Sequence, residues 1–319
     1  MIEHLVSPTK LDSLLQELRK SLQTPRDCLF GPDSVSWKIN RESALFLGAG
    51  RAALLQLAHP WVAAAIAQHS RTLHDPLSRF HHTFRVIFTM MFGSAEQAFA
   101  AARQLHRLHQ QIRGVLPDVA GRFPQGTAYE ANELAALTWV YATLVDSALV
   151  AYELVLPPLT SHERERYFLE SLRMAALFGI SPKTLPQSWT GFRAYFEAIV
   201  HSDVLGVSAA TRAFAQELQK GTGFLLPPPF WFRALTVQLL PPSIRDEFQL
   251  SYGSHEESAA KRALRLMRPL YSRLPRTIRF VGPYNEALKR LRGGNPGIGV
   301  RLSNRLWVGQ PTLLAIPHN

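Results

Sequence analysis

Apolar residues recur along most of the chain at intervals of three and four positions, the spacing that gathers them on one face of an α-helix. The stretch 11–22 is the first example, with leucines at such intervals. No stretch sustains the alternation of apolar and polar residues that is typical of a half-buried β-strand, and no internal repeat is present. The pattern therefore predicts an all-α fold, built as a single multi-helix bundle domain.

Capping residues predict where several of these helices begin. Asn40 is a suitable N-cap for a long apolar run. Asp75 followed by Pro76 predicts the start of a further helix, because proline fits the first helical turn. Capping boxes, in which Ser or Thr precedes Gln or Glu by three residues, are found at 94–97, 160–163 and 254–257.

The apolar run after Asn40 contains no formal charge between Arg51 and Arg71. Its length approaches that of a membrane span, but polar residues and Pro60 interrupt it. We therefore interpret it as a helix buried on all sides within a large protein core.

The chain divides into three expected parts. We predict an N-terminal helix within residues 1–30, a helical domain over 31–292 and an irregular C-terminal tail over 293–319. The tail is expected to be irregular because turn-forming residues are frequent from Gly293 onward.

Composition narrows the class of protein. The 319 residues are 46% hydrophobic, which supports a sizeable core, and Cys28 is the single cysteine, which excludes a disulfide scaffold. The N-terminal sequence shows no apolar stretch typical of a secretory signal, so we expect a cytoplasmic protein. Lys and Arg number 35 against 24 Asp and Glu, giving a net charge of +11. No nucleic-acid-binding motif accompanies this charge, so no nucleic-acid partner is predicted, while peripheral contact with an anionic membrane remains open.

Motifs of several common enzyme classes are missing from the sequence. It contains no nucleophile elbow, P-loop, dinucleotide-binding fingerprint in a strand context or H-E-x-x-H zinc motif. Asp75 is the only acidic residue between Glu42 and Glu96, so paired carboxylates for acid–base hydrolysis are scarce.

Histidines stand out instead. Arg79, His82 and Thr83 lie three and four positions apart and share one helix face, and His106 and His109 form a similar pair on the next helix. Facing helices with inward His and Arg are what a haem pocket requires, because imidazole binds iron and guanidinium groups hold the propionates. The alternative is that these histidines are structural residues with satisfied hydrogen bonds.

Five segments of the sequence resemble the mpaB-type oxygenase family, which includes the rubber oxygenases (latex-clearing proteins). Their order and spacing agree with that family within roughly residues 31–180. The segments are GPDSVSWKINRE (31–42), GAGRAALLQLAHPWVAAAIAQHS (48–70), DPLSRFHHTF (75–84), RQLHRLHQQIRG (103–114) and WVYATLVDSALVAY (139–152).

The resemblance implies an all-helical oxygenase that carries haem b. It implies that His109 is the proximal iron ligand and that Arg79 and Thr83 support the haem. It places His82 where the rubber enzymes have a lysine at the distal face of the iron, so His82 is the candidate catalytic residue.

Two positions depart from the family pattern. Tyr141 stands where the family has a histidine, and the stretch 59–67 has no acid to match the distal glutamate that is proposed as a base in the rubber enzymes. We expect Tyr141 to fill core space with its hydroxyl satisfied, rather than to touch the cofactor. Asp146 is expected to pair with a buried partner such as Arg51 or His59.

The leading hypothesis is a haem b-dependent oxygenase that acts with O₂ on an apolar small-molecule substrate, isoprenoid-like or another unsaturated lipid. The alternative is a non-enzymatic helical protein that binds lipids or terpenoids. A basic helix within 256–292 could hold either one peripherally at a membrane. The sequence does not fix the oligomeric state.

Overall fold

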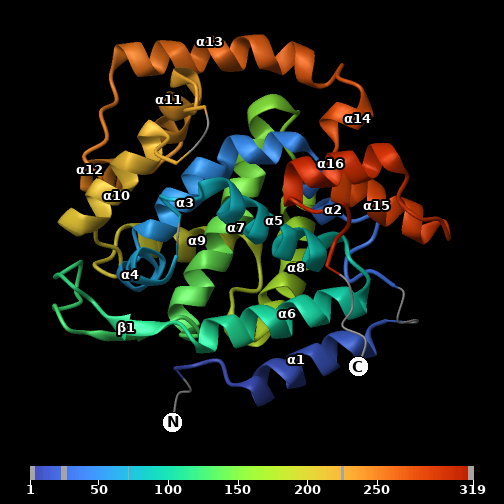
Figure 1. Ribbon diagram of the computed structural model, residues 1–319, viewed down its shortest axis with the longest axis horizontal. Coiled ribbons are helices and arrows are strands. Elements are labelled where there is room, and N and C mark those ends of the chain that lie inside the picture. The colour runs from blue at the N-terminus through green and yellow to red at the C-terminus, as the bar shows by residue number, and fades with distance from the viewer. Residues whose placement is uncertain (1–3, 23–26, 71, 224–225, 315–319) are drawn as a thin grey trace.

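A computed structural model describes residues 4–22, 27–70, 72–223 and 226–314. In these ranges, helices form nearly all of the regular structure, which confirms the all-α prediction (Figure 1). The first half contains α1 (Pro8–Lys20), α2 (Val35–Asn40), η1 (Ser43–Gly48), α3 (Ala49–Leu57), α4 (Pro60–His69), α5 (Pro76–Phe92), α6 (Ala95–Gln110), β1 (Arg113–Val115), β2 (Ala128–Glu130) and α7 (Leu134–Val155). The second half contains α8 (Ser161–Leu177), η2 (Pro182–Thr184), α9 (Trp189–Val200), α10 (Ala209–Lys220), α11 (Phe230–Gln238), α12 (Pro242–Glu247), α13 (Ser254–Tyr271), α14 (Arg276–Arg279), α15 (Gly282–Leu291) and α16 (Ile298–Val308).

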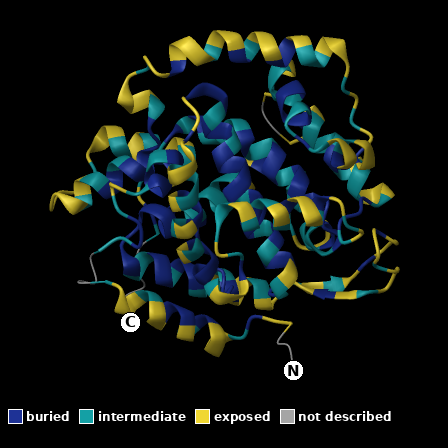
Figure 2. Cartoon of the chain, turned by 180° about the vertical axis from the view of Figure 1, so that it is seen from behind, coloured by how far each residue is buried: buried dark blue, intermediate teal, exposed yellow. Residues whose placement is uncertain are grey.

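Helix α7 runs through the middle of the molecule and packs against η1, α2, α3, α8 and α13. By length and composition it could cross a membrane, yet 67% of its most apolar window is buried by the rest of the protein. Figure 2 shows the buried residues concentrated in the central helices, whereas α1 and α13 at the periphery are largely exposed. Burial by the protein itself identifies α7 as a core helix.

The apolar run after Asn40 is not one continuous helix, as the sequence pattern had predicted. It is divided into η1, α3 and α4. The break lies at His59, whose φ of −84° and ψ of 119° are extended, because the ring of Pro60 disfavours helical geometry in the residue before it. The expectation that this run is buried on all sides is wrong: 13 of the 30 residues 41–70 are buried, and residues 67–69 at the end of α4 are exposed.

The hairpin of β1 and β2 was not expected from the sequence. Its strands pair Arg113 with Glu130 and Val115 with Ala128. The Tyr129 hydroxyl donates a hydrogen bond of 2.8 Å to the Gln68 side chain on α4, which in turn donates to the Val115 carbonyl over 2.9 Å. Contacts with α4 therefore stabilise a hairpin whose strands are too short to leave an alternating pattern.

The expected irregular tail contains a helix, so that part of the prediction is wrong. Helix α16 lies within residues 293–319 and ends at Gly309, which adopts a left-handed φ of 70°. Trp307 stacks on Phe46 with ring centroids 4.3 Å apart, and buried Asn304 donates a hydrogen bond to Glu286. Asn304 and Trp307 lie three positions apart and share one face of α16. The neighbouring glycines and prolines obscured this spacing in the sequence.

Candidate functional site

The candidate site is formed by two consecutive helices, α5 and α6, that pack against each other. The predicted start of α5 is confirmed, because the Asp75 carboxylate accepts a hydrogen bond of 3.0 Å from the Ser78 backbone. The predicted capping box of Ser94 and Gln97 opens α6. Because only Gly93 and Ser94 separate the helices, the early turns of α5 and the late turns of α6 lie near one another.

His109, the predicted iron ligand, lies in the last turn of α6 and is partly buried. Burial lowers its pKa to about 4, and the positive charges of Arg79 and His106 act in the same direction. The ring therefore stays neutral at pH 7, the form that binds metals. No hydrogen bond joins either ring nitrogen to another residue in the described part of the chain.

Arg79 connects the candidate residues electrostatically. Its charge lowers the pKa of both His109 and His82, so the guanidinium lies near the two imidazoles. Desolvation by its neighbours lowers the pKa of Arg79, although the residue as a whole is exposed. Within the described ranges its side chain forms no ion pair or hydrogen bond, which leaves its five N–H donors free for a group outside the chain.

His82 and Thr83 occupy the next turn of α5. The Arg85 guanidinium donates a hydrogen bond of 3.4 Å to His82 Nδ1. Desolvation lowers the pKa of His82, and the charges of Arg85 and Arg79 add to this effect. The hydroxyl of Thr83 has no partner among the described residues. Arg85 was not predicted from the sequence, although its position three residues after His82 on the same helix was a usable signal.

His106, one turn before His109, has a different role. Its Nε2 donates a hydrogen bond of 2.8 Å to the Val6 carbonyl, and the Asn132 side chain donates to its backbone oxygen over 3.1 Å. The buried His106 therefore ties the N-terminal segment to α6. The structural alternative for the histidines applies to His106, whereas His109 forms no such hydrogen bond among the described residues.

Asp146 is the centre of a buried ionic cluster. Its carboxylate forms an ion pair of 2.7 Å with Arg51 and a second, very short one with Arg193. The expectation of a buried partner is confirmed for Arg51. His59 is not that partner.

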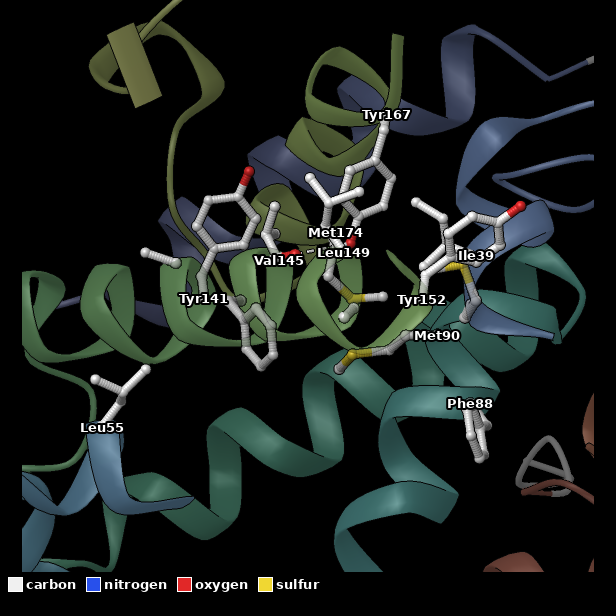
Figure 3. Close-up of a cluster of buried hydrophobic side chains, with 14 of the residues drawn as sticks. Ile39, Leu55, Phe88, Met90, Tyr141, Val145, Leu149, Tyr152, Tyr167 and Met174 are labelled. Carbon is white, nitrogen blue, oxygen red and sulfur yellow. Dashed lines mark hydrogen bonds between the residues drawn. The ribbon is translucent and has the colours of Figure 1, made fainter. Parts of the chain in front are cut away.

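Tyr141 is fully buried, and its hydroxyl lies 2.7 Å from that of Ser171. Burial raises its pKa, so the hydroxyl remains protonated. Figure 3 shows Tyr141 in the apolar cluster that also contains Val145 and Met90. This supports the interpretation of Tyr141 as a core residue.

No group of three or more His, Cys, Asp or Glu side chains is placed to hold a metal ion within the described ranges. A haem iron needs only one or two protein ligands, because the porphyrin supplies four nitrogens. The unpaired neutral imidazole of His109 beside the unpaired Arg79 fits that requirement. Two cavities have volumes of about 390 and 130 Å³. None of the four predicted site residues lines either cavity, so both lie outside the α5–α6 site.

Fold and site together define an all-α protein in which an unpaired neutral histidine on one helix lies near an exposed arginine on the helix packed against it. The family described as "ER-bound oxygenase mpaB/B'/Rubber oxygenase, catalytic domain" matches residues 37–279, about three quarters of the chain. The chain belongs to this oxygenase family. Searches of curated proteins and of solved structures found no match.

Proposed function

We propose that the protein is a haem b-dependent oxygenase that acts with O₂ on an apolar, isoprenoid-like or unsaturated lipid substrate. Membership of an oxygenase family supports the reaction class. The family description names rubber oxygenases, and rubber is an apolar polymer. The observation that carries the haem assignment is the neutral, unpaired imidazole of His109 next to the unpaired guanidinium of Arg79.

Haem, when bound, supplies an iron centre for O₂ chemistry, and the protein supplies binding and orientation. In this proposal His109 binds the iron through a ring nitrogen that is unprotonated at pH 7. Arg79 neutralises a propionate carboxylate, and Thr83, one turn later, donates a hydrogen bond to the cofactor.

His82 is the group that we assign to the reaction itself. Because its Nδ1 accepts a hydrogen bond from Arg85, the neutral ring carries its proton on Nε2. That N–H can donate a hydrogen bond to an oxygen atom at the site. Helix α4 carries no carboxylate in residues 60–69, and in this proposal we assign proton transfer to the His82 imidazole.

Haem titration of the purified protein tests the assignment. We expect one equivalent to bind and to give a Soret band and stoichiometric iron. His109→Ala should lose both, whereas His106→Gln is the matched control, because glutamine can still donate to the Val6 carbonyl. A His109→Ala protein with unchanged spectrum and iron content would remove the proposed ligand.

The same titration distinguishes the oxygenase from the alternative, a non-enzymatic helical protein that binds lipids or terpenoids. A helical protein that only binds lipids or terpenoids would be colourless when pure, would leave the broad spectrum of free haem unchanged, and would bind apolar ligands equally well without iron.

We further propose that the C-terminal region lies against an anionic membrane surface, from which an apolar substrate could enter. From Ser258 to the C-terminus the sequence has twelve Lys and Arg residues and one acid, Glu286, a difference of +11 that equals the net charge of the whole chain. Glu286 is buried. The same region has seven exposed large apolar side chains: Leu266, Leu270, Ile278, Leu291, Ile298, Leu302 and Leu306.

Helix α16 shows this combination most clearly. Ile298, Leu302 and Leu306 follow one another at intervals of four and are 79%, 57% and 65% exposed. Arg301 and Arg305 lie beside them and are also exposed. Exposed leucines next to arginines are typical of helices that lie in the interface of an anionic bilayer.

Sedimentation with vesicles tests this surface. We expect binding to phosphatidylserine-containing vesicles, weakened by salt and by Leu302→Gln combined with Leu306→Gln. Val119→Gln, at an equally exposed position outside this surface, should bind like the unmodified protein. Equal binding of both variants would contradict the placement.

A further inference from the structure

The larger cavity, of about 390 Å³, lies apart from the α5–α6 site. Apolar side chains of α7 and α9, among them Leu134, Trp139 and Ile199, form much of its wall, and Leu185 closes another side. Its volume falls within the range of small-molecule sites, roughly 300–1,000 Å³. A predominantly apolar wall favours an apolar occupant.

His59 is the polar residue that sets this cavity apart from a packing defect. It lies at the break between α3 and α4, and its side chain lines the cavity although the residue is only 1% exposed. The rings of Trp61 and Phe123 lie 5.7 and 6.1 Å from it and fix its orientation.

Neither ring nitrogen of His59 has a hydrogen-bond partner in the described part of the chain, and Nδ1 is completely buried. A neutral imidazole has one donor and one acceptor, and leaving them unpaired inside a protein is costly. Buried polar groups are nearly always paired, so an unpaired one in a cavity wall indicates a partner from outside the chain.

Tyr195 adds a second polar group to the same wall. Its hydroxyl also lacks a partner among the described residues, and burial raises its pKa to about 12. Burial together with the charge of Arg122 lowers the pKa of His59 to about 4. Both groups are therefore uncharged at pH 7. The charged groups near this wall, Arg122 and Glu133, have opposite signs and favour no net charge in an occupant.

We infer that this cavity binds an uncharged apolar molecule that carries one hydroxyl or carbonyl oxygen, held by hydrogen bonds to His59 and Tyr195. An alcohol can donate to one of these groups and accept from the other, and its hydrocarbon part contacts the apolar wall. None of the proposed haem-binding residues lines this cavity, so the inference does not depend on the haem assignment.

Calorimetry with 1-octanol, octane and octanoate tests the inference on the purified full-length protein. We expect octanol to bind more tightly than octane or octanoate. His59→Phe should weaken octanol binding about tenfold, the effect of one hydrogen bond to a buried group, and leave octane binding unchanged. Tyr195→Phe should weaken octanol binding by a smaller factor.

Thr138→Val is the matched control, because the Thr138 hydroxyl lines the cavity but already donates to the Leu134 carbonyl over 2.7 Å. Its octanol affinity should equal that of the unmodified protein. His109→Ala should also bind octanol normally, which separates this cavity from the proposed haem site.

Nitrogen-15 NMR of the histidine side chains gives a test that does not need a stable His59 variant. Octanol should shift the ring nitrogens of His59 in the unmodified protein. Octanol binding that leaves these resonances unmoved, equal affinity of His59→Phe, or no octanol binding would each overturn the inference.

Discussion

Desolvation lowers the pKa of both Arg51 and Arg79, but Arg51 is buried in the core whereas Arg79 is exposed at the surface. Arg51 donates to the Leu239 carbonyl over 2.8 Å and to the Ser147 hydroxyl over 2.7 Å, and it forms an ion pair with Asp146. Arg79 has no such partner among the described residues.

The difference separates groups that hold the fold from groups that await a ligand. The exposed guanidinium of Arg79 is solvated by water and needs no internal partner, so it remains available to a ligand. The same contrast divides the two histidines of α6, since His106 is bonded to Val6 and His109 is unpaired. We therefore expect changes at the paired residues to lower stability and changes at the unpaired ones to lower ligand binding.

The largest expected effect is at Asp146. Asp146→Ala leaves Arg51 buried without its counter-ion and should lower the free energy of unfolding by about 3–5 kcal/mol in urea titrations. Arg79→Ala in the haem-free protein should change it by less than about 0.5 kcal/mol, because no internal contact is lost. Equal losses in the two variants would remove the distinction between these arginines.

A second test uses pH. The pKa of His59 is about 4 in the folded protein and about 6.5 in an unfolded chain. Because the pKa of His59 is lower in the folded protein, the unfolded chain takes up the proton first as the pH falls. The contribution of neutral His59 to the free energy of unfolding is therefore complete above pH 6.5 and is lost as the pH falls towards 4. Between pH 7 and pH 5 this loss amounts to about 2 kcal/mol. Urea titrations of His59→Phe should show a correspondingly smaller decrease, and an unchanged decrease would contradict the buried state of His59.

His106 gives a smaller effect. His106→Ala removes the hydrogen bond to the Val6 carbonyl and should cost about 1–2 kcal/mol, with faster amide hydrogen exchange in the N-terminal segment. His106→Gln should recover much of this loss, because its amide can donate to the same carbonyl. If both variants exchange like the unmodified protein, His106 does not hold that segment.

Tyr141→Phe should have the smallest effect. It removes the hydrogen bond to Ser171, whose hydroxyl still donates to the Phe168 carbonyl, so the expected loss is about 1 kcal/mol. The haem-binding affinity should not change. A changed haem spectrum in Tyr141→Phe would instead support the alternative, that Tyr141 touches the cofactor.

The sequence predicted several of the helix starts that depend on local interactions, but Asn40 ends α2 instead of capping a helix, and α13 is capped at Gly253 instead of Ser254. The caps at Asp75, Ser94 and Thr160 were predicted correctly because a cap involves residues three positions apart. The β1–β2 hairpin and the helix α16 were missed, since contacts with Gln68 on α4 and with Phe46 on η1 stabilise them. Such distant contacts leave no local periodicity.

The candidate sites also contain one part that local sequence predicted and one part that depends on contacts between distant segments. Helical spacing placed Arg79, His82 and Thr83 on one face, and the shared electrostatic influence of Arg79 links His82 with His109. The cavity at His59 could not be predicted, because its wall joins α7, α9 and the turn before α4, which meet only in the folded protein.

The most direct test of the central claim is the absorption spectrum of His109→Gly mixed with haem, before and after addition of free imidazole. We predict a weak, altered Soret band that returns to the form of the unmodified protein when imidazole occupies the vacated position. A variant whose spectrum equals that of the unmodified protein before any imidazole is added would contradict the assignment of His109 as the iron ligand.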